Sequence, residues 1–319
     1  MASKQNRILP ARSFYIDSTD EQGLRLHISA KGSGEPVLFL HGATLYSHYY
    51  DLHFPGGSWM DRMSEAGFAC YALEVRGYGR SQSKTMKCQN KPYAPASDAI
   101  KDIDDAINWI SEQHEGTKPA LVGTSWGSVT CASYASTIGA EKICSLALLA
   151  PIFAERNEYW INMIADPENS ECFDPAWGAY RLVTVEKIRT MWDDEIPSGC
   201  DWRDDKVFDS LMSATIGADP ESLNHEPPAF RSPNGSLLDL WSCFNGTPVY
   251  DPSKINVPVL LVRGQHDITS TRSDALNLFD KLTVDVRHYV EISNGGHFLL
   301  CERKAPQIFT VMSSFLSDI

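Results

Sequence analysis

Residues 121–130 read LVGTSWGSVT and contain the pattern Gly-x-Ser-x-Gly, formed by Gly123, Ser125 and Gly127. The pattern is short enough to occur by chance, so its meaning depends on the surrounding chain. Ser125 follows the apolar run 119–123, which predicts a strand, and the residues after Ser125 predict a helix. Such a turn holds a serine in a strained conformation with its hydroxyl exposed above the sheet, and the glycines let the chain pass closely. Ser125 is therefore a candidate nucleophile.

A nucleophilic serine needs a general base, and the base needs an acid to orient it. Of the nine histidines, His297 lies in the glycine-rich loop SNGGHFLL, directly after a predicted strand at 286–292. Asp267 follows the predicted strand 257–264 in the same way. Open α/β sheets place their ligands at the carboxyl ends of their strands. We therefore expect His297 as base and Asp267 as acid. The alternatives are an N-cap role for Asp267 and His266 as base, although adjacent side chains rarely point at each other.

The oxyanion of an acyl-transfer reaction needs two N–H donors. One is expected from Trp126, the residue after the nucleophile, at the start of a helix. The other is expected from Ala43 in LFLHGAT, where a strand at 37–42 ends and Gly42 permits a bend. The Trp126 indole is expected either to line a substrate pocket or to pack in the core. Trp160 is a second candidate for contact with substrate.

The elements that position these residues alternate along the chain. The first two predicted strands form a hairpin or meander, and the later ones are apolar runs typical of strands buried on both faces. The predicted strands are 14–19, 24–30, 37–42, 69–75, 119–123, 143–151, 257–264 and 286–292. The predicted helices are 58–67, 96–113, the residues after 125, 273–282 and 306–319. This alternation predicts an α/β fold with a doubly wound, mainly parallel sheet and helices on both faces.

Residues 152–252 have a different character. They contain few strand-like runs and five of the eight tryptophans. We interpret them as a mostly helical insertion between core segments 1–151 and 253–319. Between residues 151 and 250 there are 18 acidic and 7 basic residues, which accounts for most of the chain's net charge of −13. The expected acidic surface should not attract an anionic substrate.

The composition excludes several other classes of protein. The net negative charge argues against nucleic-acid binding, and no apolar run is long enough to cross a membrane. The beginning, MASKQNRILPARSFYIDSTD, lacks the apolar core of a secretory signal. The eight cysteines have no CxxC or zinc-type spacing and are expected to be free thiols. These features predict a cytoplasmic protein without a metal site, and they leave its oligomeric state open.

At this point the chain resembles the cap-bearing branch of the α/β-hydrolase family. The resemblance is carried by LFLHGAT, EVRGYGRS, VGTSWGS, LLVRGQHD and NGGH in this order. It implies that Ser125 is the nucleophile, Asp267 the acid and His297 the base, with 152–252 as a cap over the site. Relatives that hydrolyse epoxides or carbon–halogen bonds carry Asp at the position of Ser125, so this resemblance disfavours those activities.

Two positions depart from the family's patterns. Glu74 stands where the family usually has Asp, in a glycine turn (74–82) that we interpret as structural. The turn around Ser125, GTSWGS, which we call the elbow, is also similar to the corresponding turn of proline iminopeptidases. Their oxyanion loop, however, is His-Gly-Gly-Pro-Gly, whereas the loop in this chain is HGATL.

The expected reaction is hydrolysis of an ester or lactone of a small apolar or aromatic substrate through an acyl-enzyme, which needs no metal or organic cofactor. Three further functions remain open. The first is an aminopeptidase or amidase of the proline iminopeptidase type, and the second is a hydrolase of a carbon–carbon bond in a diketone. The third is a small-molecule receptor without turnover.

Overall fold

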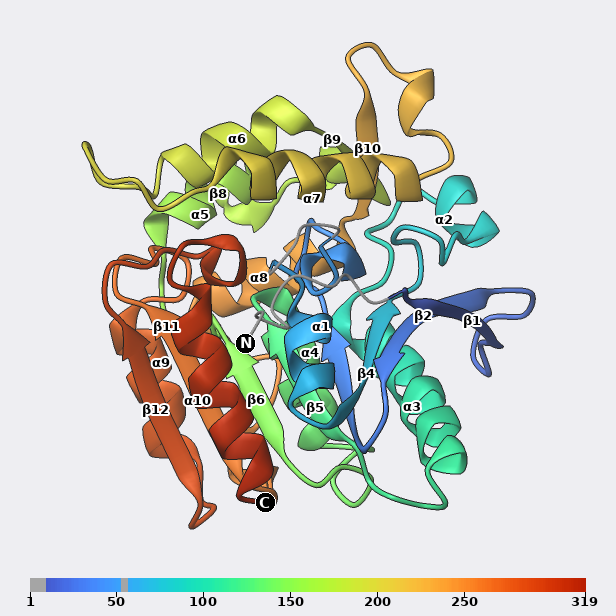
Figure 1. Ribbon diagram of the computed structural model, residues 1–319. Coiled ribbons are helices and arrows are strands. Elements are labelled where there is room, and N and C mark those ends of the chain that lie inside the picture. Colours follow the sequence, from blue (N-terminus) through green and yellow to red (C-terminus); the bar gives the residue numbers. More distant parts are fainter. Residues whose placement is uncertain (1–9, 53–56) are drawn as a thin grey trace.

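The computed structural model describes residues 10–52 and 57–319. Residues 1–9 lie outside the described residues, and so does His53. Residues 1–9 begin the segment on which the prediction of no secretory signal rests. Most described strands form one sheet in the spatial order β1-β2-β4-β3-β5-β6-β11-β12 (Figure 1). The β1–β2 and β2–β4 pairs are antiparallel, and every other neighbouring pair is parallel. The predicted hairpin and the mainly parallel sheet are therefore confirmed.

The strands of this sheet are β1 (Arg12–Asp17), β2 (Arg25–Gly32), β3 (Glu35–Leu40), β4 (Phe68–Glu74), β5 (Ala120–Thr124), β6 (Leu146–Leu149), β11 (Val259–Gly264) and β12 (Arg287–Ile292). Strands β4, β5, β6 and β11 are buried along their whole length, as their continuous apolar runs predict. Strand β1 alternates between exposed and half-buried residues because it lies at the edge of the sheet.

Helices cover both faces of the sheet. Helices α1 and α10 pack together on one face, and α3, α4 and α9 lie on the other (Figure 1). The helices outside the insertion are α1 (Trp59–Glu65), α2 (Lys84–Cys88), α3 (Ala96–Gln113), α4 (Trp126–Ala135), α9 (Arg272–Lys281) and α10 (Ala305–Ser317). In α3, the predicted apolar face is confirmed, because Ile103, Ile107 and Ile110 are buried and Ile100 is half-buried.

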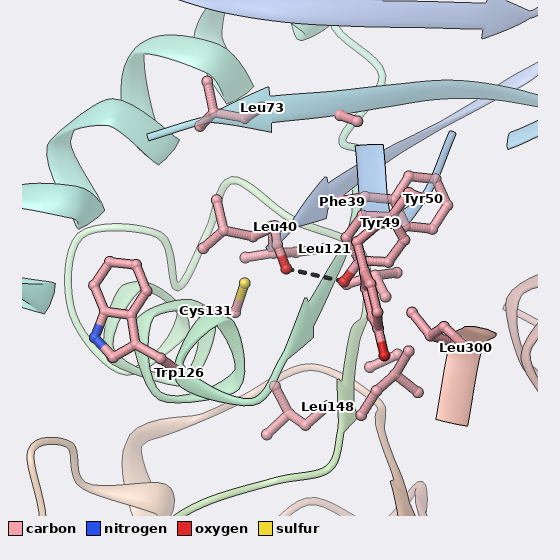
Figure 2. Close-up of a cluster of buried hydrophobic side chains, with 14 of the residues drawn as sticks. Phe39, Leu40, Tyr49, Tyr50, Leu73, Leu121, Trp126, Cys131, Leu148 and Leu300 are labelled. Atoms are coloured by element: carbon pink, nitrogen blue, oxygen red, sulfur yellow. Dashed lines mark hydrogen bonds between the residues drawn. The ribbon is translucent and has the colours of Figure 1, made fainter. Parts of the chain in front are cut away.

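The core lies between the sheet and these helices. Figure 2 shows Phe39 and Leu40 of β3 with Leu121 of β5 and Leu148 of β6. Each of these side chains is at most 2% exposed, and burial of such a side chain contributes roughly 1.5–3 kcal/mol. The Tyr50 hydroxyl donates to the Leu40 carbonyl at 2.9 Å, so the last residue of β3 has a partner beyond the sheet. This arrangement fixes the end of β3, where the predicted oxyanion loop begins.

The segment 152–252 lies over the carboxyl ends of the parallel strands (Figure 1). More of its residues lie in helices than in strands, as predicted, but it also contains two small antiparallel sheets that we did not predict. Its elements are α5 (Glu158–Ile164), β7 (Ala165–Asp166), β8 (Asn169–Phe173), β9 (Tyr180–Thr184), α6 (Val185–Asp193), α7 (Asp205–Ala218), β10 (Ala229–Pro233) and α8 (Gly235–Phe244). Strands β9 and β10 pair across a long separation in sequence, which a local pattern does not reveal.

Helix α8 is the part of this segment that packs on the core helices. The Asp239 carboxylate accepts hydrogen bonds from the Ala96 N–H at 2.6 Å and from the Trp126 indole at 2.8 Å. A division of the chain at residues 152 and 252 into core and cap therefore stays a prediction. Over the described parts of the chain, no helix has both the length and the apolar character needed to cross a membrane.

Candidate active site

Ser125 lies in a sharp turn between β5 and α4, as predicted. Its φ of 58° is in the left-handed region, which a residue with a side chain rarely adopts. The Ser125 N–H donates to the Leu149 carbonyl of β6 at 2.9 Å, which ties the turn to the sheet. A Cβ on Gly123 would lie 2.2 Å from the Gly127 carbonyl oxygen, and a Cβ on Gly127 would lie 2.4 Å from the His41 oxygen. The turn therefore requires glycine on both sides of Ser125.

The fold brings Ser125, His297 and Asp267 together from three separate strand ends. The Ser125 hydroxyl lies 2.9 Å from His297 Nε2, and His297 Nδ1 lies 2.9 Å from Asp267 Oδ2. This is the series of contacts in which an imidazole can take a proton from a serine while a carboxylate orients the ring.

Asp267 is held in place by its own loop. Its Oδ1 accepts the N–H groups of Thr269 and Ser270 at 2.9 and 2.8 Å, which leaves Oδ2 directed at His297. The N-cap of α9 is Thr271, so the N-cap role considered for Asp267 is wrong. His266 is exposed and its ring packs on Trp202, whereas His297 is the histidine that contacts both Asp267 and Ser125.

Carboxyl groups surround His297. Burial disfavours the imidazolium, but the Asp267 carboxylate, and then Glu195 and Glu302, outweigh this effect and raise the pKa of His297 to about 9. Glu195 Oε2 accepts the His297 N–H at 2.7 Å, and Glu302 Oε2 accepts the Gly296 N–H at 2.9 Å. Burial raises the pKa of both glutamic acids. The loop that carries His297 is therefore held from two sides by buried carboxyl groups.

The predicted oxyanion loop lies directly against the elbow. A Cβ on Gly42 would be 3.2 Å from Ser125 Cβ, so glycine allows this close approach. The Ala43 carbonyl accepts hydrogen bonds from the Tyr78 hydroxyl at 3.0 Å and from Arg181 Nη2 at 2.8 Å. These contacts fix the residue whose N–H is expected to face an oxyanion. The Trp126 N–H is at the first residue of α4, where backbone N–H groups have no partner within the helix.

A cavity of about 340 Å³ opens beside these groups, with Ser125, His297 and Ala43 in its wall. Most of its lining is apolar and comes from both the core and the segment 152–252. Representative apolar residues are Leu45, Tyr49, Ile164, Leu182, Ile188 and Leu240. Trp160 also lines the cavity, as expected, and its indole donates to Thr269 Oγ1 at 2.9 Å.

The expectation that the Trp126 ring lines the pocket is wrong. The side chain is fully buried and is not part of the cavity wall. Its indole stacks on Tyr78, with the ring centroids 6.0 Å apart, and donates to Asp239 at 2.8 Å. A buried indole N–H requires an acceptor, and Asp239 of α8 supplies one. The expectation of core packing is therefore correct.

Three charged residues in the cavity wall were not predicted as site residues. They are Arg181, Lys187 and Glu195, all from the segment 152–252. In the sequence they stand in YRLVTVEK and MWDDEIPSG, which have no spacing that distinguishes them from residues on a solvated surface. Only the packing of this segment over the strand ends brings them to the cavity.

The glycine turn after β4 is structural, as predicted. Glu74 is fully buried and accepts hydrogen bonds from Ser47 Oγ at 2.9 Å and from the Arg80 N–H at 2.7 Å. All eight cysteines are free thiols, as expected. Among residues 10–52 and 57–319, no group of three His, Cys, Asp or Glu side chains is placed to hold a metal ion.

Comparison with known proteins agrees with this architecture. The family model of the α/β-hydrolase fold matches residues 35–181, which include the oxyanion loop and the elbow. An epoxide hydrolase from Caballeronia sordidicola is 29% identical over 136 residues, which are 43% of this chain and 37% of that relative. The chain thus matches well under half the length of that curated relative.

Two solved structures match almost the whole chain. An epoxide hydrolase from Vigna radiata has a TM-score of 0.67 and 17% identity, over 97% of this chain and 98% of that chain. A serine hydrolase involved in carbazole degradation has a TM-score of 0.65 and 18% identity, over 97% of this chain and 100% of that chain. The architecture, the matched segment and these neighbours agree, so the chain has the α/β-hydrolase fold.

Proposed function

We propose that this chain is a serine hydrolase that cleaves an ester or lactone of a small, largely apolar substrate through an acyl-enzyme. The observation that carries the proposal is the hydrogen-bonded series Ser125–His297–Asp267 in the wall of an apolar cavity of about 340 Å³. A cavity of this size is in the range of small-molecule sites.

The reaction proceeds in two halves. Ser125 Oγ attacks the substrate carbonyl while His297 Nε2 takes the hydroxyl proton, and Asp267 stabilises the imidazolium that forms. The N–H groups of Ala43 and Trp126 bind the oxyanion. His297 returns the proton to the leaving oxygen, and the ester bond breaks. Water, activated by His297, then attacks the acyl-enzyme and releases the acid.

Two of the similar proteins are epoxide hydrolases, but we do not propose epoxide hydrolysis for this chain. A carboxylate that opens an epoxide forms an ester, which water can cleave at its carbonyl. Ser125 Oγ would instead form an ether, which has no carbonyl for water to attack. The serine at the elbow therefore favours an acyl substrate.

One cation in the cavity wall weighs against an aminopeptidase. Arg181 lines the cavity beside the oxyanion loop, and its positive charge disfavours the cationic amino terminus of an aminopeptidase substrate. Cleavage of a carbon–carbon bond in a diketone and binding without turnover stay open, because both are compatible with the same residues. The cytoplasmic location and a small-molecule partner likewise stay predictions.

The proposal is tested with Ser125→Ala. This variant should lower kcat/KM for 4-nitrophenyl butyrate by at least about 10⁴-fold, because the members of such a triad act as a unit. Ser314→Ala, which changes an exposed serine of α10, is the matched control and should keep wild-type activity.

Labelling separates an enzyme from a receptor. A fluorophosphonate should form a covalent bond to Ser125 Oγ with loss of fluoride, and Ser125→Ala should not be labelled. Wild-type activity in a folded Ser125→Ala variant would contradict the proposal. A panel of esters, lactones, aminoacyl amides and diketones, with the same variant as background, identifies the bond that is cleaved.

A further inference from the structure

Arg181 is the cation in the cavity wall that lies nearest the predicted oxyanion loop. It belongs to β9, and within the described part of the chain its guanidinium contacts only neutral acceptors. Nη2 donates to the Ala43 carbonyl at 2.8 Å and to Thr44 Oγ1 at 2.9 Å. Nη1 donates to Asn234 Oδ1 at 3.0 Å and to the Pro233 carbonyl at 3.2 Å. These contacts place the cation but do not neutralise it.

Arg181 is half-buried, and the arginines of the described chain that are fully buried are neutralised. Arg76, Arg231 and Arg263 are each at most 3% exposed. Each forms an ion pair with a carboxylate, namely Asp102, Asp219 and Glu291 respectively. This is the usual arrangement, because a buried charge without a counter-charge is costly.

Arg181 differs from these three arginines. Among the described residues no carboxylate forms an ion pair with it, and its Nε–H has no acceptor. Burial lowers its pKa, and the groups that act against this effect are the hydroxyls of Tyr78 and Tyr46 rather than acids. A guanidinium nevertheless stays protonated in proteins, so a positive charge remains in the cavity wall.

We propose that Arg181 is an anion-binding residue and that the substrate carries a carboxylate on the oxyanion side of Ser125. The substrate carboxylate supplies the missing counter-charge and accepts the Nε–H. This inference rests on the proposed function for the position of the scissile carbonyl. It also revises the expectation that the acidic segment 151–250 does not attract an anionic substrate. Surface charge affects the rate at which substrate and protein meet, whereas Arg181 acts on the substrate once it is bound.

The test uses two esters that differ only at the end of the acyl chain. Mono-4-nitrophenyl glutarate has a terminal carboxylate where 4-nitrophenyl valerate has a methyl group. The measured quantity is the ratio of kcat/KM for the glutaryl ester to that for the valeryl ester. In Arg181→Gln this ratio should fall about 10- to 100-fold, the range expected for a charge-assisted hydrogen bond. A weakened oxyanion loop would instead slow both esters together and leave the ratio unchanged.

Lys187→Gln is the matched control, because Lys187 also lines the cavity. It should leave the ratio within about twofold of the wild-type value. An unchanged ratio in folded Arg181→Gln, or an equal fall in Lys187→Gln, overturns the proposal.

Binding gives a readout that does not depend on turnover. Calorimetry on Ser125→Ala should show tighter binding of the glutaryl ester, and Ser125→Ala/Arg181→Gln should lose this preference. Equal binding of the two esters to Ser125→Ala overturns the inference even if the Arg181 variants do not fold. If the wild type binds the glutaryl ester preferentially but hydrolyses neither ester, the proposed function fails and the anion site stands.

Discussion

Glu195 places a carboxyl group against the backbone of His297, where its Oε2 accepts the His297 N–H. It therefore adds negative potential to the site in which Asp267 already pairs with the imidazole. An imidazole that must accept a proton from Ser125 has to be neutral first. The acid limb of the reaction's pH profile should consequently reflect every carboxyl group close to His297.

Replacement of this carboxyl group should change the pH profile. The raised pKa of His297 predicts that wild-type kcat/KM increases with pH, with a midpoint above the ordinary histidine value of 6.5. Glu195→Gln keeps an oxygen acceptor for the His297 N–H but removes the charge. It should shift the midpoint to lower pH by about 0.5 to 1, because the imidazolium loses a stabilising neighbour.

The control for this experiment is Glu186→Gln, which makes the same charge change at an exposed position of α6. Its midpoint should match the wild type. A midpoint in Glu195→Gln that stays in place or moves to higher pH would show that Glu195 does not act on His297 through its charge.

At the scale of elements, the elbow depends on how closely α4 approaches β3. A Cβ on Gly127 would meet two backbone oxygens, His41 O at 2.4 Å and Leu40 O at 2.6 Å. Backbone atoms cannot rotate away as a flexible side chain can. An added methyl group must therefore push the start of α4, and Ser125 with it, away from the end of β3.

Gly127→Ala should thus lower both stability and activity. We expect a loss of about 1–3 kcal/mol in the free energy of unfolding, as for other overpacked sites. The kcat/KM for a nitrophenyl ester should fall by about 100-fold, the cost of a misplacement near 1 Å. Denaturant titration and steady-state kinetics measure the two effects.

Gly217 provides the opposite case. It lies in helix α7, and a Cβ there would meet nothing within 4 Å. Gly217→Ala should stabilise the protein by about 0.5–1 kcal/mol through helix propensity and leave activity unchanged. If both alanine variants behaved alike, close approach at the elbow would not be the reason for Gly127.

At the scale of the whole molecule, several groups bind protons more tightly in the folded protein than in the unfolded chain. The Asp267 carboxylate holds the pKa of His297 at about 9, and burial raises the pKa of Glu302 and of Asp239 to about 7. Each raised pKa contributes stability that is lost as pH rises through its folded value. Burial lowers the pKa of His27 and of His41 to about 4. These two histidines therefore lower the stability as pH falls below 6.5, and they have no effect above that pH.

The protein should therefore become less stable between pH 6.5 and 9. We expect Tm to fall across this range and to fall less steeply in His297→Gln, which removes the group with the highest of these values. His288→Gln removes an exposed imidazole of β12 and should retain the wild-type slope. A Tm that rises with pH, or an unchanged slope in His297→Gln, would contradict this account.

Much of the framework is predictable from the sequence because its signals are local. Buried strands appear as continuous apolar runs, and α3 appears as apolar residues at helical spacing. Ser125, Asp267 and His297 are recognisable because each follows a predicted strand, and parallel strands bring their carboxyl ends to one edge. The direction of the Trp126 ring is not predictable in this way, since it depends on an acceptor at Asp239, 113 residues away.

The sequence by itself determined the sheet, the elbow and the order of the three candidate catalytic residues, because each depends on neighbouring residues along the chain. Only the tertiary structure decided what faces the cavity. Arg181 and Glu195 reach it because the pairing of β9 with β10 and the packing of α6 place them over the strand ends. Such contacts join distant residues, so no local pattern shows that Arg181 has no carboxylate partner among residues 10–52 and 57–319.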